Sequence, residues 1–310
     1  MDTKPDILEW LLEPIDISVR YRTLSELLNR GPKDREFREA KAAIPGSPAV
    51  TRLFTAMLPD GSWNYAYRHK RSRYLFFVMT SLGWAAELGL DRTDERVTRA
   101  VRHLFSLQSE DGDFNRHYSC YNGLILRTLN RLGFGLDSHT VLLRRLLKRS
   151  ARHDGGFHCD IRPRRKANAS PHKSCIKGSI AALLAFAEDK HLRRSEQTKP
   201  LADYFLRRHV LFRTDDLRTP VLDKTLDLSF PFTYTSGLVE AVYALALLGY
   251  GNRHEMKEAW SLLASKRDED SRLPLERSVV WPHVSHTPRR RPSKWLTLYA
   301  CLAEKARNKG

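Results

Sequence analysis

The stretch His172-Lys-Ser-Cys175-Ile-Lys-Gly178-Ser-Ile180 decides which fold we expect, because it occurs twice. Further upstream the chain reads His117-Tyr-Ser-Cys120-Tyr-Asn-Gly123-Leu-Ile125, so His, Ser, Cys, Gly and Ile recur at identical spacing. Each copy opens an almost continuously apolar run, over 121–134 and 176–187. An internal repeat of this kind indicates a fold in which one structural unit is stacked on the next.

A second repeated element is a turn in which an aspartate and a glycine precede an aromatic residue. It reads Asp60-Gly-Ser-Trp63, Asp111-Gly-Asp-Phe114 and Asp154-Gly-Gly-Phe157. An almost continuously apolar segment follows each turn, which predicts a buried helix. Between these apolar segments lie others in which apolar residues recur every three or four positions, which predicts helices with one buried and one exposed face. The sequence thus predicts an all-α fold with an inner ring of apolar helices (74–90, 121–134, 176–187, 238–250, 295–303) wrapped by an outer ring (95–107, 140–150, 200–211, 255–266).

The first 49 residues differ from the repeats that follow. Short helical segments are broken by Pro14, Gly31-Pro32 and Pro45-Gly46. We therefore expect an N-terminal helical lead-in over 1–49, packed on a ring domain over 50–310.

Composition adds a strongly basic character, with a net charge of +17 and a pI of about 9.9. Such a surface attracts anions, nucleic acid included, although solubility alone also accounts for it. The chain shows no secretory signal, and its longest apolar run is too short to span a membrane. We expect a cytoplasmic protein without a transmembrane segment. P-loop, Gly-x-Gly-x-x-Gly and Gly-x-Ser-x-Gly patterns are absent.

Cysteines and histidines near the two repeat copies predict a metal site. A ring would bring successive helix starts to one rim, so distant thiols would become neighbours, and three cysteines with one histidine form a recognised zinc set. His117 or His158 could replace the histidine, and the alternative is that the thiols only pack between helices. The predicted zinc ligands are Cys120, Cys159, His172 and Cys175.

Several stretches then resemble a known superfamily. Trp10-Leu-Leu-Glu13, Ser18-Val-Arg-Tyr-Arg-Thr-Leu24, Leu228-Ser-Phe-Pro231 and Pro292-Ser-Lys-Trp295, together with the Asp-Gly turns, are similar to the squalene cyclases and protein prenyltransferases. Within this terpenoid cyclase superfamily, the chain most resembles bacterial and archaeal single-domain members of unassigned activity. The resemblance implies an α/α-toroid, and in prenyltransferases an aspartate, a cysteine and a histidine hold zinc; Asp160, Cys175 and His172 could do so here. The Asp-x-Asp-Asp acid of the cyclases is missing.

Two functions follow from this reading. The first is a prenyltransferase-like or cyclase-like protein that contains zinc and binds an isoprenoid or other apolar ligand with an anionic head in the ring. The second is a noncatalytic, zinc-stabilised scaffold that binds an anionic partner through its basic rim. The residues expected to line a ligand cavity, unless they plug the ring as core, are Trp63, Tyr67, His117, His158, Tyr234 and Trp281.

Overall fold

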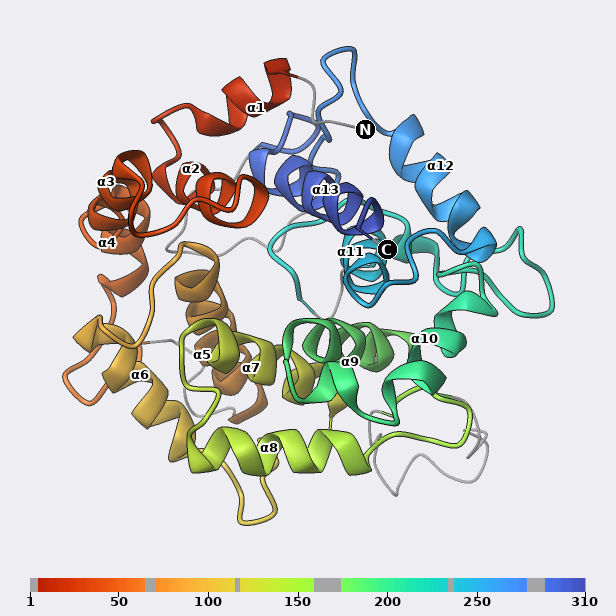
Figure 1. The fold of residues 1–310 in the computed structure, drawn as a ribbon. Helices are drawn as coiled ribbons and strands as arrows, with labels where there is room; N and C mark the ends of the chain where they lie inside the picture. Colours follow the sequence, from red (N-terminus) through yellow and green to blue (C-terminus); the bar gives the residue numbers. More distant parts are fainter. Residues whose placement is uncertain are drawn as a thin grey trace.

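The computed structural model describes residues 5–64, 71–114, 118–158, 174–233, 237–277 and 288–309. Within these ranges the chain is helical, with isolated β-bridges and no β-strand. Figure 1 looks along the axis of two concentric rings of helices. The all-α, α/α-toroid fold predicted from the sequence is therefore confirmed.

The inner ring is made of apolar helices. Neighbours pack in the order α5, α7, α9, α11 and α13, and α13 also packs on the N-terminal helices α2 and η1. An ion pair between Arg22 of α2 and Glu87 of α5 closes the circle. The inner elements are α2 Ile17–Arg22, its π-helical continuation η1 Thr23–Leu27, α5 Arg71–Glu87, α7 Ser119–Arg131, α9 Ile176–Glu188, α11 Leu238–Leu247 and α13 Lys294–Arg307.

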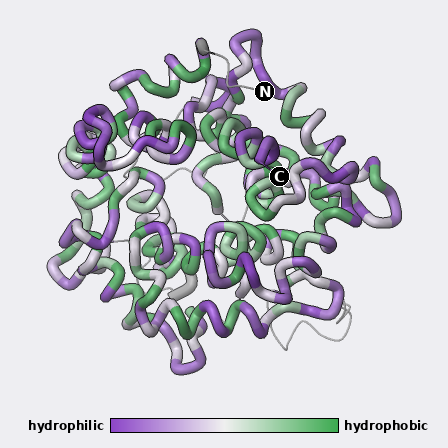
Figure 2. The backbone as a smooth tube through the Cα atoms, in the orientation of Figure 1, coloured by the Kyte–Doolittle hydropathy of each residue, from purple (hydrophilic) through white to green (hydrophobic). Residues whose placement is uncertain are grey.

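The outer ring consists of amphipathic helices. In α6, Val97, Val101 and Leu104 are buried whereas Arg99 and Arg102 are exposed, as the striped pattern predicts. Figure 2 shows the most hydrophilic stretches around the periphery of the molecule. The outer elements are α1 Pro5–Leu12, α3 Arg35–Ala43, α4 Pro48–Phe54, α6 Glu95–Phe105, α8 Ser138–Arg149, α10 Thr198–Leu206 and α12 Lys257–Ser265.

The N-terminal segment takes part in both rings. α2 and η1 lie inside, against α13, while α1, α3 and α4 lie outside (Figure 1). Sequence analysis did not anticipate α4, which begins after Ser47; the hydroxyl of Ser47 accepts a hydrogen bond from the amide of Val50, and Pro48 occupies the first helical position. The division of the chain at residue 50 stays a prediction.

The Asp-Gly-aromatic turns join the rings. Their glycines, Gly61, Gly112 and Gly155, all have a positive φ. A Cβ at Gly61 would lie 2.3 Å from a backbone oxygen of α6, and one at Gly155 would lie 2.1 Å from a backbone oxygen of α10. At Gly112 the corresponding oxygen belongs to α8, at 3.0 Å. Only glycine therefore allows each turn to press against the next outer helix. The aromatic residues of the turns are buried: Trp63, Phe114 and Phe157.

The middle of the ring is filled by the segment that precedes α11. Phe230 stacks on Trp295 with ring centroids 5.0 Å apart, and Phe232 lies 4.4 Å from the ring of Tyr299. This segment crosses the centre of the view in Figure 1. The cavity left between Phe232, α5 and α7 holds only about 20 Å³. Phe230 and Phe232 therefore leave little open space at this point of the ring.

No helix within the described ranges is both long enough and apolar enough to cross a membrane.

Candidate functional site at the mouth of the ring

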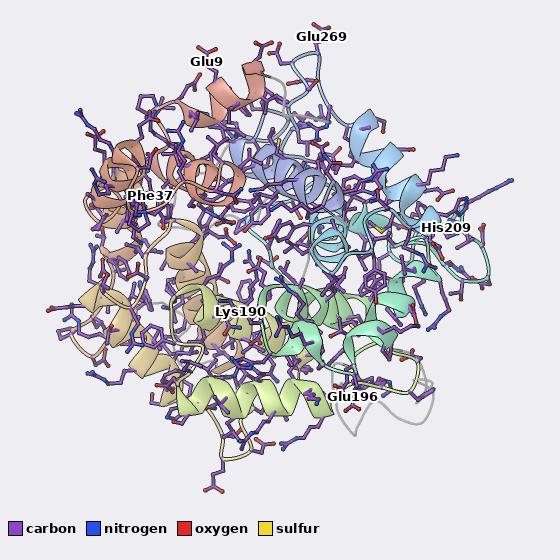
Figure 3. The ribbon with its side chains drawn as sticks, in the orientation of Figure 1. Glu9, Phe37, Lys190, Glu196, His209 and Glu269 are labelled. Atoms are coloured by element: carbon purple, nitrogen blue, oxygen red, sulfur yellow. The ribbon has the colours of Figure 1, made fainter. Side chains whose placement is uncertain are left out.

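A cavity of about 440 Å³ lies where the inner helices end. The ends of α2, α5, α7, α9 and α11 reach it, together with η1 and one residue of α3. Lys190, two residues after the end of α9, lies near the middle of the view in Figure 3, at this rim. We call this space the mouth cavity. The charged residues that line it are Arg22, Glu26, Lys41, Asp91, Arg131, Glu188 and Arg193.

Arg22 forms one wall of the cavity and is almost fully buried. Its Nε and Nη2 donate to the two carboxylate oxygens of Glu26, at 2.7 and 2.8 Å. Its Nη1 donates to Glu87 and, at 2.9 Å, to the hydroxyl of Tyr299. Arg22 therefore connects α2 and η1 with α5 and α13 in the interior of the ring.

Two arginines of α7 complete the network. Arg127 donates to Glu87 at 2.6 Å and to the Tyr299 hydroxyl at 2.6 Å, while the Nε of Arg131 donates to Glu188 at 2.6 Å. The Tyr299 hydroxyl in turn donates to Glu87 at 2.7 Å. Three cations thus balance three carboxylates. The arginine–glutamate cluster consists of Arg22, Glu26, Glu87, Arg127, Arg131 and Glu188.

The cluster controls the protonation of its members. Burial by itself would raise the pKa of each glutamate, but the adjacent arginines outweigh it and lower the pKa of Glu26 to about 2. The pKa values of Glu87 and Glu188 are also lowered, for the same reason. Burial raises the pKa of the phenols of Tyr243 and Tyr299. At neutral pH the three carboxylates are therefore ionised and both phenols keep their protons.

Arg193 is the cation of the mouth cavity best placed to meet a ligand. Its Nε and Nη2 donate to the carbonyl oxygen of Ala187, which orients the guanidinium group. Across the described residues, no carboxylate pairs with it. Lys41, in contrast, is held by Asp91 at 2.7 Å and by the carbonyl oxygen of Gly89 at 2.6 Å. An anionic ligand group would consequently find its free partner at Arg193.

Two of the predicted zinc ligands, Cys120 and Cys175, can be placed, and both lie at the opposite end of the ring. Cys120 lies in the first turn of α7, and Cys175 is the residue before α9. Both helix starts contact one turn, because Ser119 Oγ donates to the carbonyl oxygen of His158 and the amide of Cys175 donates to that of Phe157, each at 2.8 Å. The common rim expected from the repeat is thus present.

Zinc itself stays a prediction. Cys159 and His172, like the alternative ligand His117 and the carboxylate Asp160, lie outside the described residues. Among the residues that are described, no group of three potential metal ligands occurs.

Only two of the predicted cavity residues can be placed. Trp63 is fully buried between Phe54 and Phe77, and its indole Nε1 donates to the carbonyl oxygen of Leu53 at 3.1 Å. It therefore belongs to the core. His158 is half-buried beside the start of α7. Outside the described ranges lie Tyr67, His117, Tyr234 and Trp281.

Sequence analysis missed the arginine–glutamate cluster. One signal was available: Glu87 and Arg127 interrupt the apolar segments 74–90 and 121–134, and Glu188 directly follows the segment 176–187. A charge buried in that position needs a partner of opposite charge. The identity of the partners could not be read from the sequence, because Arg22 and Tyr299 are 277 residues apart.

Comparison with known proteins bears on the fold. The sequence matches no family model and no curated protein. Among solved structures, it is similar to a glycosyl hydrolase of family 88 from Bacteroides vulgatus, with a TM-score of 0.54 and 13% identity over 98% of this chain and 91% of that one. A polysaccharide lyase also has a TM-score of 0.54, with 14% identity over 95% of this chain and 90% of that one.

These similarities correct the family that we inferred from sequence motifs. The two similar structures named above are a glycosyl hydrolase and a polysaccharide lyase, so the resemblance to squalene cyclases and prenyltransferases was wrong. The motifs that carried it, such as the Asp-Gly turns, are features of ring geometry. The expected isoprenoid ligand is wrong as well, since the similar structures are a glycosyl hydrolase and a polysaccharide lyase, and Phe230 and Phe232 fill the centre of the ring. Nothing in the comparisons supports the alternative scaffold that binds nucleic acid.

Proposed function

We propose that this protein binds an acidic carbohydrate in the mouth cavity and cleaves its glycosidic linkage. The observation that carries the proposal is a cavity at the mouth of the toroid that is lined by Arg193, a cation without a carboxylate partner among the described residues. The similarity in fold to a glycosyl hydrolase and a polysaccharide lyase supports a carbohydrate as the ligand.

The size and lining of the mouth cavity suit a sugar. Its volume of about 440 Å³ falls in the range of about 300–1,000 Å³ that is usual for small-molecule sites. Tyr21 and Tyr243 contribute aromatic surface, while Ser25 and Glu26 contribute hydrogen-bonding groups. A sugar presents apolar C–H faces and hydroxyl edges, so this combination can meet both.

The protonation states favour elimination over hydrolysis. Hydrolysis needs a carboxyl group that keeps its proton to protonate the leaving oxygen. Glu26, Glu188 and Asp91 all have lowered pKa values and are ionised at neutral pH. In elimination, an ionised carboxylate of the cavity lining such as Glu26 takes the proton from the carbon next to the substrate carboxylate, and the C–H electron pair forms a C=C bond. The glycosidic C–O bond on the neighbouring carbon breaks, its electron pair leaves with the sugar oxygen, and that oxygen takes a proton from water. Arg193 would stabilise the charge that develops on that carboxylate.

The test is a panel of acidic and neutral polysaccharides incubated with the purified protein. We expect new reducing ends from acidic polysaccharides alone, with an ultraviolet-absorbing unsaturated product that marks elimination. Arg193→Gln should weaken substrate binding about tenfold or more, since it removes a charge-assisted contact of about 1.5–3 kcal/mol. Arg213→Gln is the matched control, because Arg213 pairs with Asp215 on the exposed surface. Absence of binding and cleavage for every polysaccharide, or an unaffected Arg193→Gln variant, would refute the proposal.

A further inference from the structure

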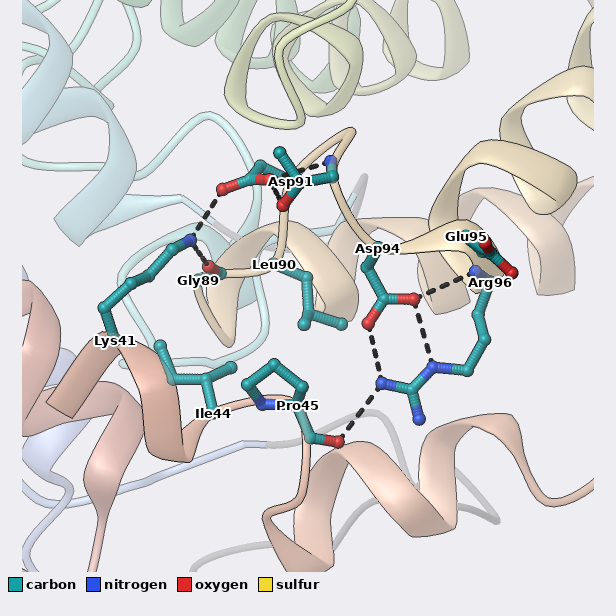
Figure 4. Close-up of a pocket in the computed structure, with 10 residues that line it drawn as sticks. Lys41, Ile44, Pro45, Gly89, Leu90, Asp91, Asp94, Glu95 and Arg96 are labelled. Carbon is teal, nitrogen blue, oxygen red and sulfur yellow. Dashed lines mark hydrogen bonds and ion pairs between the residues drawn. The ribbon is translucent and has the colours of Figure 1, made fainter. Parts of the chain in front are cut away.

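A second cavity, of about 390 Å³, adjoins the mouth cavity. The two share Lys41, Gly89, Leu90 and Asp91 in their linings, so they meet at the Lys41–Asp91 ion pair. From there the second cavity extends between the end of α3 and the start of α6 (Figure 4). We call it the outer groove. It leads away from the ring axis, and a ligand in the mouth cavity could continue into it.

The lining of the outer groove is amphipathic. Figure 4 shows Ile44, Pro45 and Leu90 between the Lys41–Asp91 pair on one side and the Asp94–Arg96 pair on the other. Pro45 is exposed, and Ile44 and Leu90 are buried beneath it. An apolar strip flanked by polar groups matches a sugar ring, whose C–H face and hydroxyl edge differ in the same way.

Hydrogen bonds hold the walls of the groove in place. The carboxylate of Asp91 accepts from the amide and hydroxyl of Thr93, at 2.9 and 2.6 Å, as well as from Lys41. Arg96 donates to Asp94 at 2.6 Å and to the carbonyl oxygen of Pro45 at 3.1 Å, which ties α6 to the loop after α3. The groove is therefore formed before any ligand arrives, and binding would not have to order it.

The charge of the groove differs from that of the mouth cavity. Three carboxylates, of Asp91, Asp94 and Glu95, face two cations, of Lys41 and Arg96. The pKa values of Asp91 and Asp94 are lowered, because hydrogen bonds from Lys41 and Arg96 outweigh the effect of burial. The groove thus offers ionised acceptors, which suit hydroxyl donors, whereas a ligand carboxylate would be repelled.

We propose that the mouth cavity and the outer groove are consecutive subsites for one carbohydrate chain. An acidic sugar occupies the mouth cavity, and the next sugar, which is uncharged, lies on Pro45 in the outer groove. The ligand is then an oligosaccharide in which acidic and neutral units adjoin, and Lys41 marks the junction. This inference rests on the proposed function of the mouth cavity.

The experiment measures binding of acidic monosaccharides, of disaccharides with one acidic and one neutral unit, and of longer chains, by calorimetric titration. We expect the disaccharide to bind at least about tenfold more tightly than the monosaccharide. Glu95→Trp would fill the outer groove and keep the hydrogen bonds of Asp91 and Arg96 that hold its walls. It should abolish the gain from the second sugar and leave monosaccharide binding unchanged. Glu110→Trp, in an exposed turn away from both cavities, is the matched control, and thermal unfolding checks that all variants fold.

The results distinguish a failure of the outer groove as a subsite from a failure of the mouth cavity as a carbohydrate site. If the monosaccharide binds as tightly as the disaccharide, or if Glu95→Trp binds both like the native protein, the outer groove is no subsite, and the mouth cavity keeps its proposed role. A chain of two acidic units that binds better than the mixed disaccharide also overturns the inference. If no carbohydrate of any length binds, the proposed function fails first and the inference fails with it.

Discussion

Glu87 should be the most sensitive position in the ring. Its carboxylate is 2% exposed and accepts hydrogen bonds from Arg22, from Arg127 at 2.6 Å and from Tyr299 at 2.7 Å. Glu87→Gln keeps the shape but removes the negative charge, so three buried arginines are left with two glutamates. Removing one partner of a buried ion pair typically costs about 3–5 kcal/mol. We expect the free energy of unfolding to fall by that amount.

Equilibrium unfolding in urea measures this loss. The midpoint should move to a lower urea concentration with little change in slope, because the surface exposed on unfolding stays the same. Glu39→Gln is the control: Glu39 pairs with Arg35 on an exposed helix face, and its loss should change stability by about 0.5 kcal/mol or less.

A double variant tests the physical reason. Glu87→Gln combined with Arg127→Met restores the balance of charge and should be more stable than Glu87→Gln alone. If Glu87→Gln unfolds at the same urea concentration as the Glu39→Gln control, the cluster does not stabilise the ring, and the reasoning is refuted.

Three further predictions concern the helix packing, the pH dependence and the metal. Gly123→Ala should destabilise by about 1–3 kcal/mol in urea, because a Cβ there would lie 2.7 Å from the backbone of α9, whereas Gly46→Ala, with open space around it, should not. The pKa of Glu26 is about 2 in the folded protein and 4.5 without its neighbours, so its contribution to stability is complete above about pH 4.5 and is lost as the pH falls towards 2. In a plot of the free energy of unfolding against pH, Glu26→Gln should flatten this range. A plot that the substitution leaves unchanged would contradict the prediction. Elemental analysis should find about one zinc per chain, lost in Cys120→Ser and Cys175→Ser together with thermal stability; a stable native protein without metal would assign both thiols to packing.

The helices of the ring were predictable because their signals are local. An inner helix is apolar on all sides and an outer helix on one side only, so each can be recognised within its own sequence. The signals for the turns are equally local, because Gly61 has a positive φ that favours glycine and the apolar Trp63, two residues later, is buried. The start of α9 was placed correctly at Ile176, and that of α7 was missed by two residues, since the structure begins it at Ser119.

The mouth cavity could not be predicted in the same way. Its residues come from α2, η1 and α3, from the ends of four inner helices and from the segments that follow α5 and α9. Each of its charged members appears in the sequence as an ordinary charged residue. Of the two roles that the sequence left open for Trp63, lining a cavity or belonging to the core, the structure shows the second. Motifs that reflect ring geometry also suggested the wrong family, since rings of this kind carry more than one chemistry.

The sequence by itself determined the order and type of the helices and, through the repeated His-x-Ser-Cys and Asp-Gly elements, the ring into which they assemble. These features follow from backbone conformation and apolar periodicity over a few neighbouring residues. Only the tertiary structure decided what lies inside the ring. Closing the circle brings Arg22 to Tyr299 and Glu87, and the segment before α11 fills the centre with Phe232. Which charged residues pair in the interior depends on which of them the fold brings close together. The number of residues between two charged residues in the sequence does not indicate whether they pair.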